Sequence, residues 1–182
     1  MATFWNDMNL EPYRGFRWII EMSSIKDKIY AMKVDKPMFK VGEYNHKILN
    51  HQFNYPGRLV WDPVAATVVD VPGGPAHTLF EAIQKAGYDT AWMKGPEGTD
   101  GITKSRFGNS LATSGQIVIS QLKAMQGDPI AGGQTHEIGQ SWTLNNCFLT
   151  DVKFGSLDYG TEDAVQIQFT IRYDWATLDS AE

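Results

Sequence analysis

Residues 165–175 alternate strictly between apolar and polar side chains. One face would carry Val165, Ile167, Phe169, Ile171, Tyr173 and Trp175, and the other would carry Gln166, Gln168, Thr170, Arg172 and Asp174. This period of two predicts a single β-strand with one face on a core and the other in water. Such a strand needs neighbouring strands and a covering layer, so the chain must be built around a packed β-sheet.

Eight further segments have the composition of strands and are bounded by turn residues. We expect the segment 16–22 to form a hairpin with 29–34, and the segment 135–144 to pair back on 115–126. The remaining four segments are 38–44, 47–55, 64–71 and 147–154.

The stretch 35–71 is the least regular part of this pattern. Its first two strand segments mix polar and apolar residues without strong alternation, and a corner at Tyr44, Asn45 and His46 is expected to join them. A turn at Pro56 and Gly57 is expected to follow. Neither face suits an ordinary core, so this sheet either lies open to water on one side or meets another subunit.

One helix is predicted after residue 75. Pro75 suits a first helical turn and Gly87 suits a helix end. Between them, an apolar stripe at helical spacing is formed by Ala76, Leu79, Phe80, Ile83 and Ala86. The fold class is therefore mainly β, an antiparallel barrel or sandwich with one flanking α-helix.

Length and composition favour one domain over 1–182, with a polar arm at 1–15 and a long loop at 88–114. A short helical turn is expected near 105–111 within that loop. The net charge of −5 lacks the basic excess that grasps nucleic acid. Neither a signal peptide nor an apolar run long enough for a membrane anchor is evident.

No arrangement of residues predicts an enzyme, a cofactor or a metal site. The four histidines lack the spacing of a metal site, and the Gly-rich segment 95–101 lacks the ending of a phosphate loop. Asp158, Glu162 and Asp163 form a solvated loop or, as the alternative, a cation site. Cys147 is expected to be a buried, inert thiol.

Three pieces of the chain together resemble the tail tube proteins of contractile-tailed bacteriophages. The first is Leu10-Glu11-Pro12 followed by Phe16-Arg17-Trp18, and the last is the ending 165–175. The middle piece joins Val34-Asp35-Lys36-Pro37 to Asn45-His46-Lys47-x-Leu49-Asn50-His51 and Tyr55-Pro56-Gly57-Arg58-Leu59-x-Trp61. The resemblance extends to the related tubes of type VI secretion and tailocins.

The resemblance implies a structural virion protein without enzymatic activity. Hexameric rings would stack into a hollow tube inside a contractile sheath and would conduct the genome into the host. The implied partners are other copies of the chain, the sheath protein, baseplate and tail-terminator proteins, and, transiently in the lumen, the tape measure protein and genomic DNA. Assembly would occur in the host cytoplasm, and the final location would be the virion.

Three other functions remain open. The chain is alternatively a tube-initiating baseplate protein, or the inner tube protein of a contractile injection or type VI-like secretion system. A small β-barrel enzyme or ligand-binding module is the third possibility.

The tube hypothesis assigns roles to polar residues on the mixed-polarity strands. Tyr44, Asn45, His46, Pro56 and Gly57 are the predicted contacts between rings. Because Lys and Arg would retain DNA, a neutral or acidic channel wall is expected. The predicted lumen-facing residues are Glu43, Asn45, Asn50, Gln52, Asn54, Gln116, Ser120, Thr135, Glu137, Ser141 and Thr143.

Overall fold

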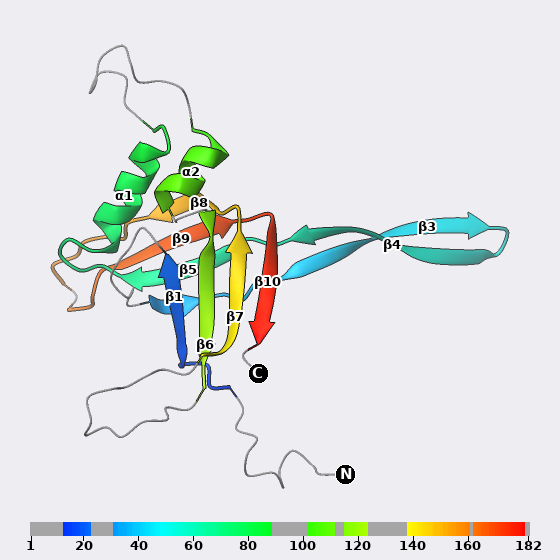
Figure 1. Cartoon of the computed structure of the whole chain (residues 1–182), viewed down its shortest axis with the longest axis horizontal. Helices are drawn as coiled ribbons and strands as arrows, with labels where there is room; N and C mark the ends of the chain where they lie inside the picture. Colours follow the sequence, from blue (N-terminus) through cyan, green and yellow to red (C-terminus); the bar gives the residue numbers. More distant parts are fainter. Residues whose placement is uncertain are drawn as a thin grey trace, which may run out of the picture.

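The computed structural model describes residues 13–22, 31–88, 102–111, 115–123, 138–160 and 162–180. Within these residues the chain forms ten strands and two helices (Figure 1). The strands are β1 Trp18–Met22, β2 Ala31–Val34, β3 Phe39–Ile48, β4 His51–Trp61, β5 Val64–Val69, β6 Ile117–Leu122, β7 Ile138–Asn145, β8 Phe148–Lys153, β9 Gln166–Arg172 and β10 Trp175–Ser180. The helices are α1 Pro75–Lys85 and α2 Lys104–Leu111.

Eight of the strands form two antiparallel sheets. Sheet A has the order β1-β6-β7-β10, and sheet B has the order β2-β5-β9-β8. The strands of sheet A run across those of sheet B (Figure 1), which is the arrangement of crossed sheet packing. The predicted mainly β, sandwich-like class is confirmed, although the described strands of one chain do not close into a barrel.

The core lies between the two sheets and follows their alternation. β5 and β9 pair in register and direct Val64, Ala66 and Val68 inward beside the apolar residues of β9. Sheet A contributes Ile20, Met22, Ile117, Ile119 and Leu144 from the other side. Burial of these side chains is the main stabilising term of the sandwich.

The predicted strand 165–175 is two strands rather than one. Its apolar face is confirmed as far as Tyr173, because Ile167, Phe169 and Ile171 are at most 2% exposed. The strand ends at Arg172, however, and Trp175 begins β10 in the other sheet, where it is 46% exposed. The alternation therefore marks core positions correctly but conceals a crossing between sheets.

Polar groups hold this crossing in place. The Asp174 backbone N–H donates to the Asn145 carbonyl oxygen at 3.0 Å, and Asn146 donates to the Asp174 carboxylate at 2.9 Å. The hydrogen bond from Lys104, with a smaller effect of Asn146, lowers the pKa of Asp174. Asn146 has a φ of 57°, and there the chain makes a second crossing, from β7 to β8. Both crossings meet at one corner of the sandwich.

Strand pairing follows the sheets rather than the order of the chain. The predicted hairpin of 16–22 with 29–34 is wrong, because β1 pairs with β6 while β2 pairs with β5. The two strands contribute to opposite layers of the sandwich, so neighbouring positions in sequence do not make them partners. The predicted pairing of 115–126 with 135–144 is confirmed as β6 with β7.

Helix α1 agrees with its prediction, and α2 lies where a short helical turn was expected. Pro75 opens α1, Leu79 and Ala82 are buried, and Gly87 follows its end with a φ of 113°. Within the predicted loop 88–114, α2 begins after Thr103, whose hydroxyl oxygen accepts the Arg106 backbone N–H. α2 confirms the helical turn expected near 105–111, and it adds a second helix to the single one named in the predicted fold class. No helix among the described residues is long and apolar enough to span a membrane.

We expect Ile171→Ala to destabilise the sandwich by about 2–5 kcal/mol, because it leaves a cavity at a fully buried position. Chemical denaturation monitored by circular dichroism would measure the change. Leu59→Ala, at a position that is 50% exposed in β4, serves as the control and should change stability by roughly 0.5 kcal/mol or less. Equal losses in the two variants would contradict the assignment of the core.

Candidate assembly surfaces

Strands β3 and β4 form a two-stranded arm, residues 39–61, that projects away from the sandwich (Figure 1). Residues 39–60 are all exposed. The turn lies at Leu49 and Asn50, where Leu49 has a φ of 53° and is 99% exposed. The predicted corner at Tyr44, Asn45 and His46 is therefore wrong, because these residues lie within β3.

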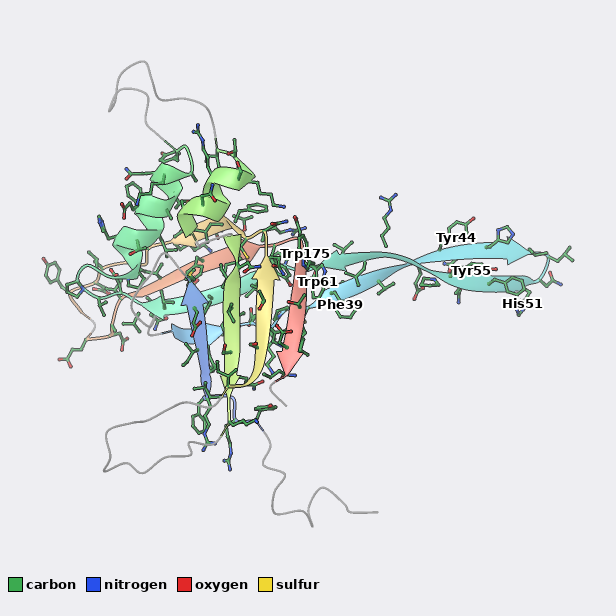
Figure 2. The ribbon with its side chains drawn as sticks, viewed as in Figure 1. Phe39, Tyr44, His51, Tyr55, Trp61 and Trp175 are labelled. Carbon is green, nitrogen blue, oxygen red and sulfur yellow. The ribbon has the colours of Figure 1, made fainter. Side chains whose placement is uncertain are left out.

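The outer half of the arm has two chemically different faces. Cross-strand register pairs Tyr44 with Tyr55 and His46 with Phe53 on one face. The Tyr44 and Tyr55 ring centroids lie 6.4 Å apart, and those of His51 and Phe53 lie 4.7 Å apart (Figure 2). The opposite face carries Glu43, Asn45, Lys47, Gln52 and Asn54. Pairing in register thus gives an aromatic face and a polar face to segments that look irregular in sequence.

The inner half of the arm is anchored on the core. Phe39 packs edge-on against Trp61 at 5.2 Å between ring centroids, and Trp61 lies 5.8 Å from the buried ring of Tyr173 (Figure 2 labels Phe39 and Trp61). Val41 and Leu59 pair on the same ribbon face, each about half exposed. The arm therefore begins as an extension of the core and continues beyond it into solvent.

A β-bulge separates the two halves. Val41 pairs with Leu59, but Glu43 pairs with Pro56, so β4 has one extra residue at this point. The predicted turn at Pro56 and Gly57 is thus wrong, since both residues belong to this bulge. A Cβ atom on Gly57 would lie 2.9 Å from the Gly42 carbonyl oxygen, a distance that side chains do not tolerate. The bulge therefore requires glycine at position 57.

The predicted lumen residues fall into three groups. Five of them lie on the arm, namely Glu43, Asn45, Asn50, Gln52 and Asn54. Four lie at sheet A, namely Gln116, Ser120, Ser141 and Thr143. The last two, Thr135 and Glu137, lie outside the described residues. No single surface of one chain therefore brings the whole set together.

The four residues at sheet A do share a surface. Ser120 pairs with Ser141, and Thr143 pairs with Thr177, which places hydroxyl groups in rows across the outer face of the sheet. Glu21 and Asp179 lie on the two outer strands of the same face. Ser120 is 2% exposed, whereas Ser141 and Thr143 are half-buried. Gln116 donates to the Asn145 side chain at 2.8 Å.

Sheet A also has two unpaired edges in the described part of the chain. β1 and β10 are its outer strands, and each pairs on one side only. Such edges are sites at which another chain can add a strand. The sequence predicted the segment of β1 as a hairpin partner of 29–34 and predicted no strand beyond Trp175, so neither edge was identified as a contact site.

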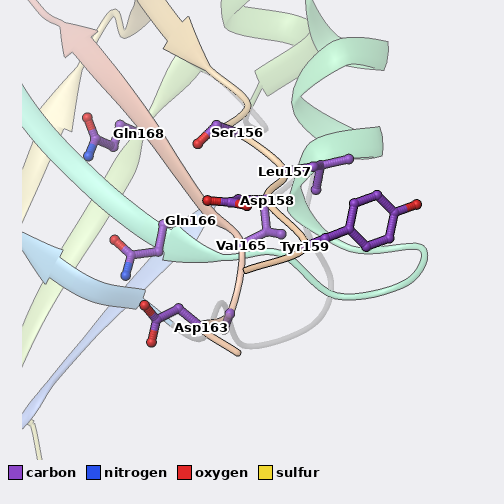
Figure 3. Close-up of a pocket in the computed structure, with 10 residues that line it drawn as sticks. Ser156, Leu157, Asp158, Tyr159, Asp163, Val165, Gln166 and Gln168 are labelled. Atoms are coloured by element: carbon purple, nitrogen blue, oxygen red, sulfur yellow. The ribbon is translucent and has the colours of Figure 1, made fainter. Parts of the chain in front are cut away.

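The acidic loop after β8 lines a hollow of about 640 Å³ (Figure 3). Its lining residues include Ser156, Leu157, Asp158, Tyr159, Gln166 and Gln168. The Asp158 carboxylate accepts the Gly160 backbone N–H at 2.9 Å. Across the described ranges, no three His, Cys, Asp or Glu residues are grouped to hold a metal ion, so nothing favours the cation alternative here.

An apolar groove lies between α1, α2 and the edge strand β8. Its volume is about 570 Å³. Phe80 and Phe154 meet across it at 6.3 Å between ring centroids, and each is more than 40% exposed. The lining residues are Phe80, Ile83, Tyr88, Ile102, Lys104, Phe107, Phe148, Leu149, Thr150, Asp151, Val152 and Phe154.

Comparison with known proteins gives matches among solved structures. No protein-family model and no curated protein matches the chain. The cryo-EM structure of an extracellular contractile injection system, PVC sheath/tube terminator in the extended state, has a TM-score of 0.64 at 17% identity, covering 94% of this chain and 99% of that chain. The anti-feeding prophage cap, described as a tube terminating cap, has a TM-score of 0.63 at 20% identity over the whole of both chains.

A third structure, the PVC sheath–tube complex in the extended state, has a TM-score of 0.58 at 19% identity, covering 93% of each chain. At these identities the matches establish the fold. The chain has the fold of these components of contractile injection systems, as the sequence resemblance led us to expect.

We expect Gly57→Ala to disrupt the arm while leaving the sandwich folded, because its Cβ would collide with the Gly42 backbone. Hydrogen exchange should show faster exchange of the β3 and β4 amides and unchanged protection in β5 and β9. Gly42→Ala is the matched control, because its Cβ would lie 3.6 Å from the Arg58 carbonyl oxygen, an ordinary contact. The same exchange pattern in both variants would show that the bulge does not depend on Gly57.

Cys147 should be unreactive in the folded protein. It is 0% exposed, and burial raises the pKa of its thiol to about 12, so almost no thiolate forms below pH 9. An aromatic disulfide reagent at pH 8 should label it only after denaturant is added. Rapid labelling of the native protein would contradict the predicted inert thiol.

Proposed function

We propose that this chain is a structural subunit of the tube of a contractile tail or injection machine, without enzymatic activity. The observation that carries the proposal is the arm, whose exposed aromatic face has no cover within the described chain. A two-stranded ribbon of this kind is marginal alone in water, so it is built to be covered by a partner. The shared fold with contractile injection system chains supports the same conclusion.

Rings would form through the edges of sheet A. The edge strand β10 of one copy would pair with β1 of the next, and repetition around a hexameric ring would close a continuous inner barrel. Closure removes the exposed edges that otherwise favour uncontrolled association. Because the two edges differ, the contact is head-to-tail, which generates a ring when the rotation closes.

The channel wall would be the outer face of sheet A. Ser141, Thr143 and Gln116 form its neutral polar part, and Glu21 and Asp179 make its margins acidic. The apolar residues on the same face are Ile19, Val118 and Trp175. A wall of this composition lets a polyanion slide, because phosphate contacts with Lys and Arg would hold it. We leave the buried Ser120 out of this wall and assign the five predicted lumen residues on the arm to contacts between subunits instead.

The arm would provide the contacts between rings or between neighbours within a ring. Tyr44, Asn45 and His46 lie on its outer half, and Pro56 and Gly57 shape its bulge. Our sequence-based assignment of these residues to subunit contacts therefore stays a proposal, with the arm as its physical basis. The sheath protein, baseplate and terminator proteins, tape measure protein and DNA complete the proposed partners, and the virion is the proposed location.

Two of the three structures described above are a sheath/tube terminator and a tube terminating cap, which favours a tube-end role as a second candidate. A baseplate initiator belongs to the same class. A tube that secretes effector proteins rather than DNA would have the same architecture. Capsid or DNA-packaging genes next to the gene for this chain would argue against such a secretion role.

Electron microscopy of the purified protein is the test. A main tube subunit should form stacked rings or long tubes, whereas an initiator or terminator should form single rings that do not extend. Light scattering over a range of salt concentrations would measure the assembled mass in parallel. A monomer under every condition would contradict the proposed function.

A further inference from the structure

We propose that the arm of one copy docks the aromatic face of its outer half in the groove between α1, α2 and β8 of a second copy. The inference rests on the proposed function, since it names the receptor for the arm in the assembly. The arm and the groove are both exposed in one chain, and both carry aromatic residues. Their chemistry, position and charge together identify them as partners.

The aromatic residues of the outer half of the arm lie on one ribbon face, opposite to the face that carries Val41 and Leu59. The bulge moves those of β4 from the ribbon face that carries Val41 to the face that carries Tyr44. In β4 the extra residue brings Tyr55 opposite Tyr44 and Phe53 opposite His46, whereas alternation from the Val41–Leu59 pair would place them opposite Asn45 and Lys47. The outer half of the arm therefore presents one aromatic face.

The groove has a matching surface. Phe80, Ile102 and Phe154 are between 41% and 55% exposed, so their apolar surface is available to a partner. The volume of about 570 Å³ is within the range in which pockets enclose several groups at once. Leu49 at the tip of the arm is 99% exposed, and the groove offers the apolar surroundings that it lacks.

Charge favours a second copy of this chain as the partner. The arm, residues 39–61, carries three basic residues and one acidic residue. The rest of the chain carries 13 basic and 20 acidic residues. A basic arm is therefore attracted to the acidic body of another copy.

Position excludes docking within one copy. The arm leaves the sandwich on the side away from α1 and α2 (Figure 1). A surface at one end that fits a different surface at the other end produces a head-to-tail contact. Each docked copy then leaves its own groove open to the next arm, as a repeating assembly requires.

Photo-crosslinking on assembled protein tests the contact directly. Phe53, on the aromatic face, is replaced by benzoylphenylalanine, and crosslinked peptides are identified by mass spectrometry. We expect crosslinks to a second copy within 80–88, 102–107 or 148–154. Crosslinks to the loop 155–165 or to sheet A in place of the groove would overturn the inference.

Matched variants provide a second measurement. Phe53→Glu in the arm and Phe80→Glu in the groove make the same change at residues that are 42% and 44% exposed. Each should raise the protein concentration needed for assembly at least tenfold, and the double variant should be little worse than either, because one contact is lost. Leu157→Glu, at an 88% exposed site outside the groove, is the control and should assemble normally.

The outcomes separate this inference from the proposed function. Normal assembly of Phe80→Glu together with failure of Phe53→Glu would place the receptor elsewhere and leave the tube proposal intact. Failure of the unmodified chain to assemble would instead refute the proposed function. Should Phe80→Glu not fold, as judged by its thermal unfolding, Ile102→Glu tests the same surface at a 55% exposed position.

Discussion

The aromatic face of the arm is the constraint on which the other surfaces of this molecule depend. Tyr44, Phe53 and Tyr55 remain 42–61% exposed, and packing within the arm alone does not remove them from water. Retaining such a surface is unfavourable for an isolated chain, since each buried aromatic contributes on the order of a few kcal/mol. The sandwich supplies the stability that permits this, and the proposed assembly would supply the cover.

Local periodicity was sufficient for the parts of the fold that local interactions decide. The alternation of Ile167, Phe169 and Ile171 identified the core face of β9, and the stripe through Leu79 identified α1. Turn residues also predicted the pairing of β6 with β7 correctly. The alternation did not locate the corner at Asp174, because the sequence goes on alternating where the chain crosses between the sheets. The strand that pairs with β2 is decided by the sheet that β2 joins. The residues near β2 in the sequence do not encode that choice.

The sequence indicated that the chain has an exposed surface of this kind, but it did not indicate which residues form the turn of the arm or the groove. The weak patterning of 35–71 indicated strands without an ordinary core face, and residues 39–60 are indeed exposed, yet the predicted corner at Tyr44–His46 and turn at Pro56–Gly57 were wrong. The extra residue at Gly57 reverses which ribbon face the following residues of β4 point to. Alternation counted along the sequence therefore predicts the wrong cross-strand partners. The groove combines Phe80, Ile102 and Phe154 from three separate elements, and its signal exists only in the folded chain.

The bulge also explains why the arm can serve as a docking element. A twisted two-stranded ribbon with strict alternation carries its apolar side chains around the ribbon axis, so a partner meets apolar residues on one half and polar residues on the other. Without the extra residue, alternation from the Val41–Leu59 pair would place Tyr55 opposite Asn45 and Phe53 opposite Lys47. The parity shift at Gly57 instead pairs Tyr55 with Tyr44 and Phe53 with His46. Glycine at this position therefore does more than relieve a collision. It gathers the aromatic residues of both strands on one face of the outer arm, the face that the proposed docking would use.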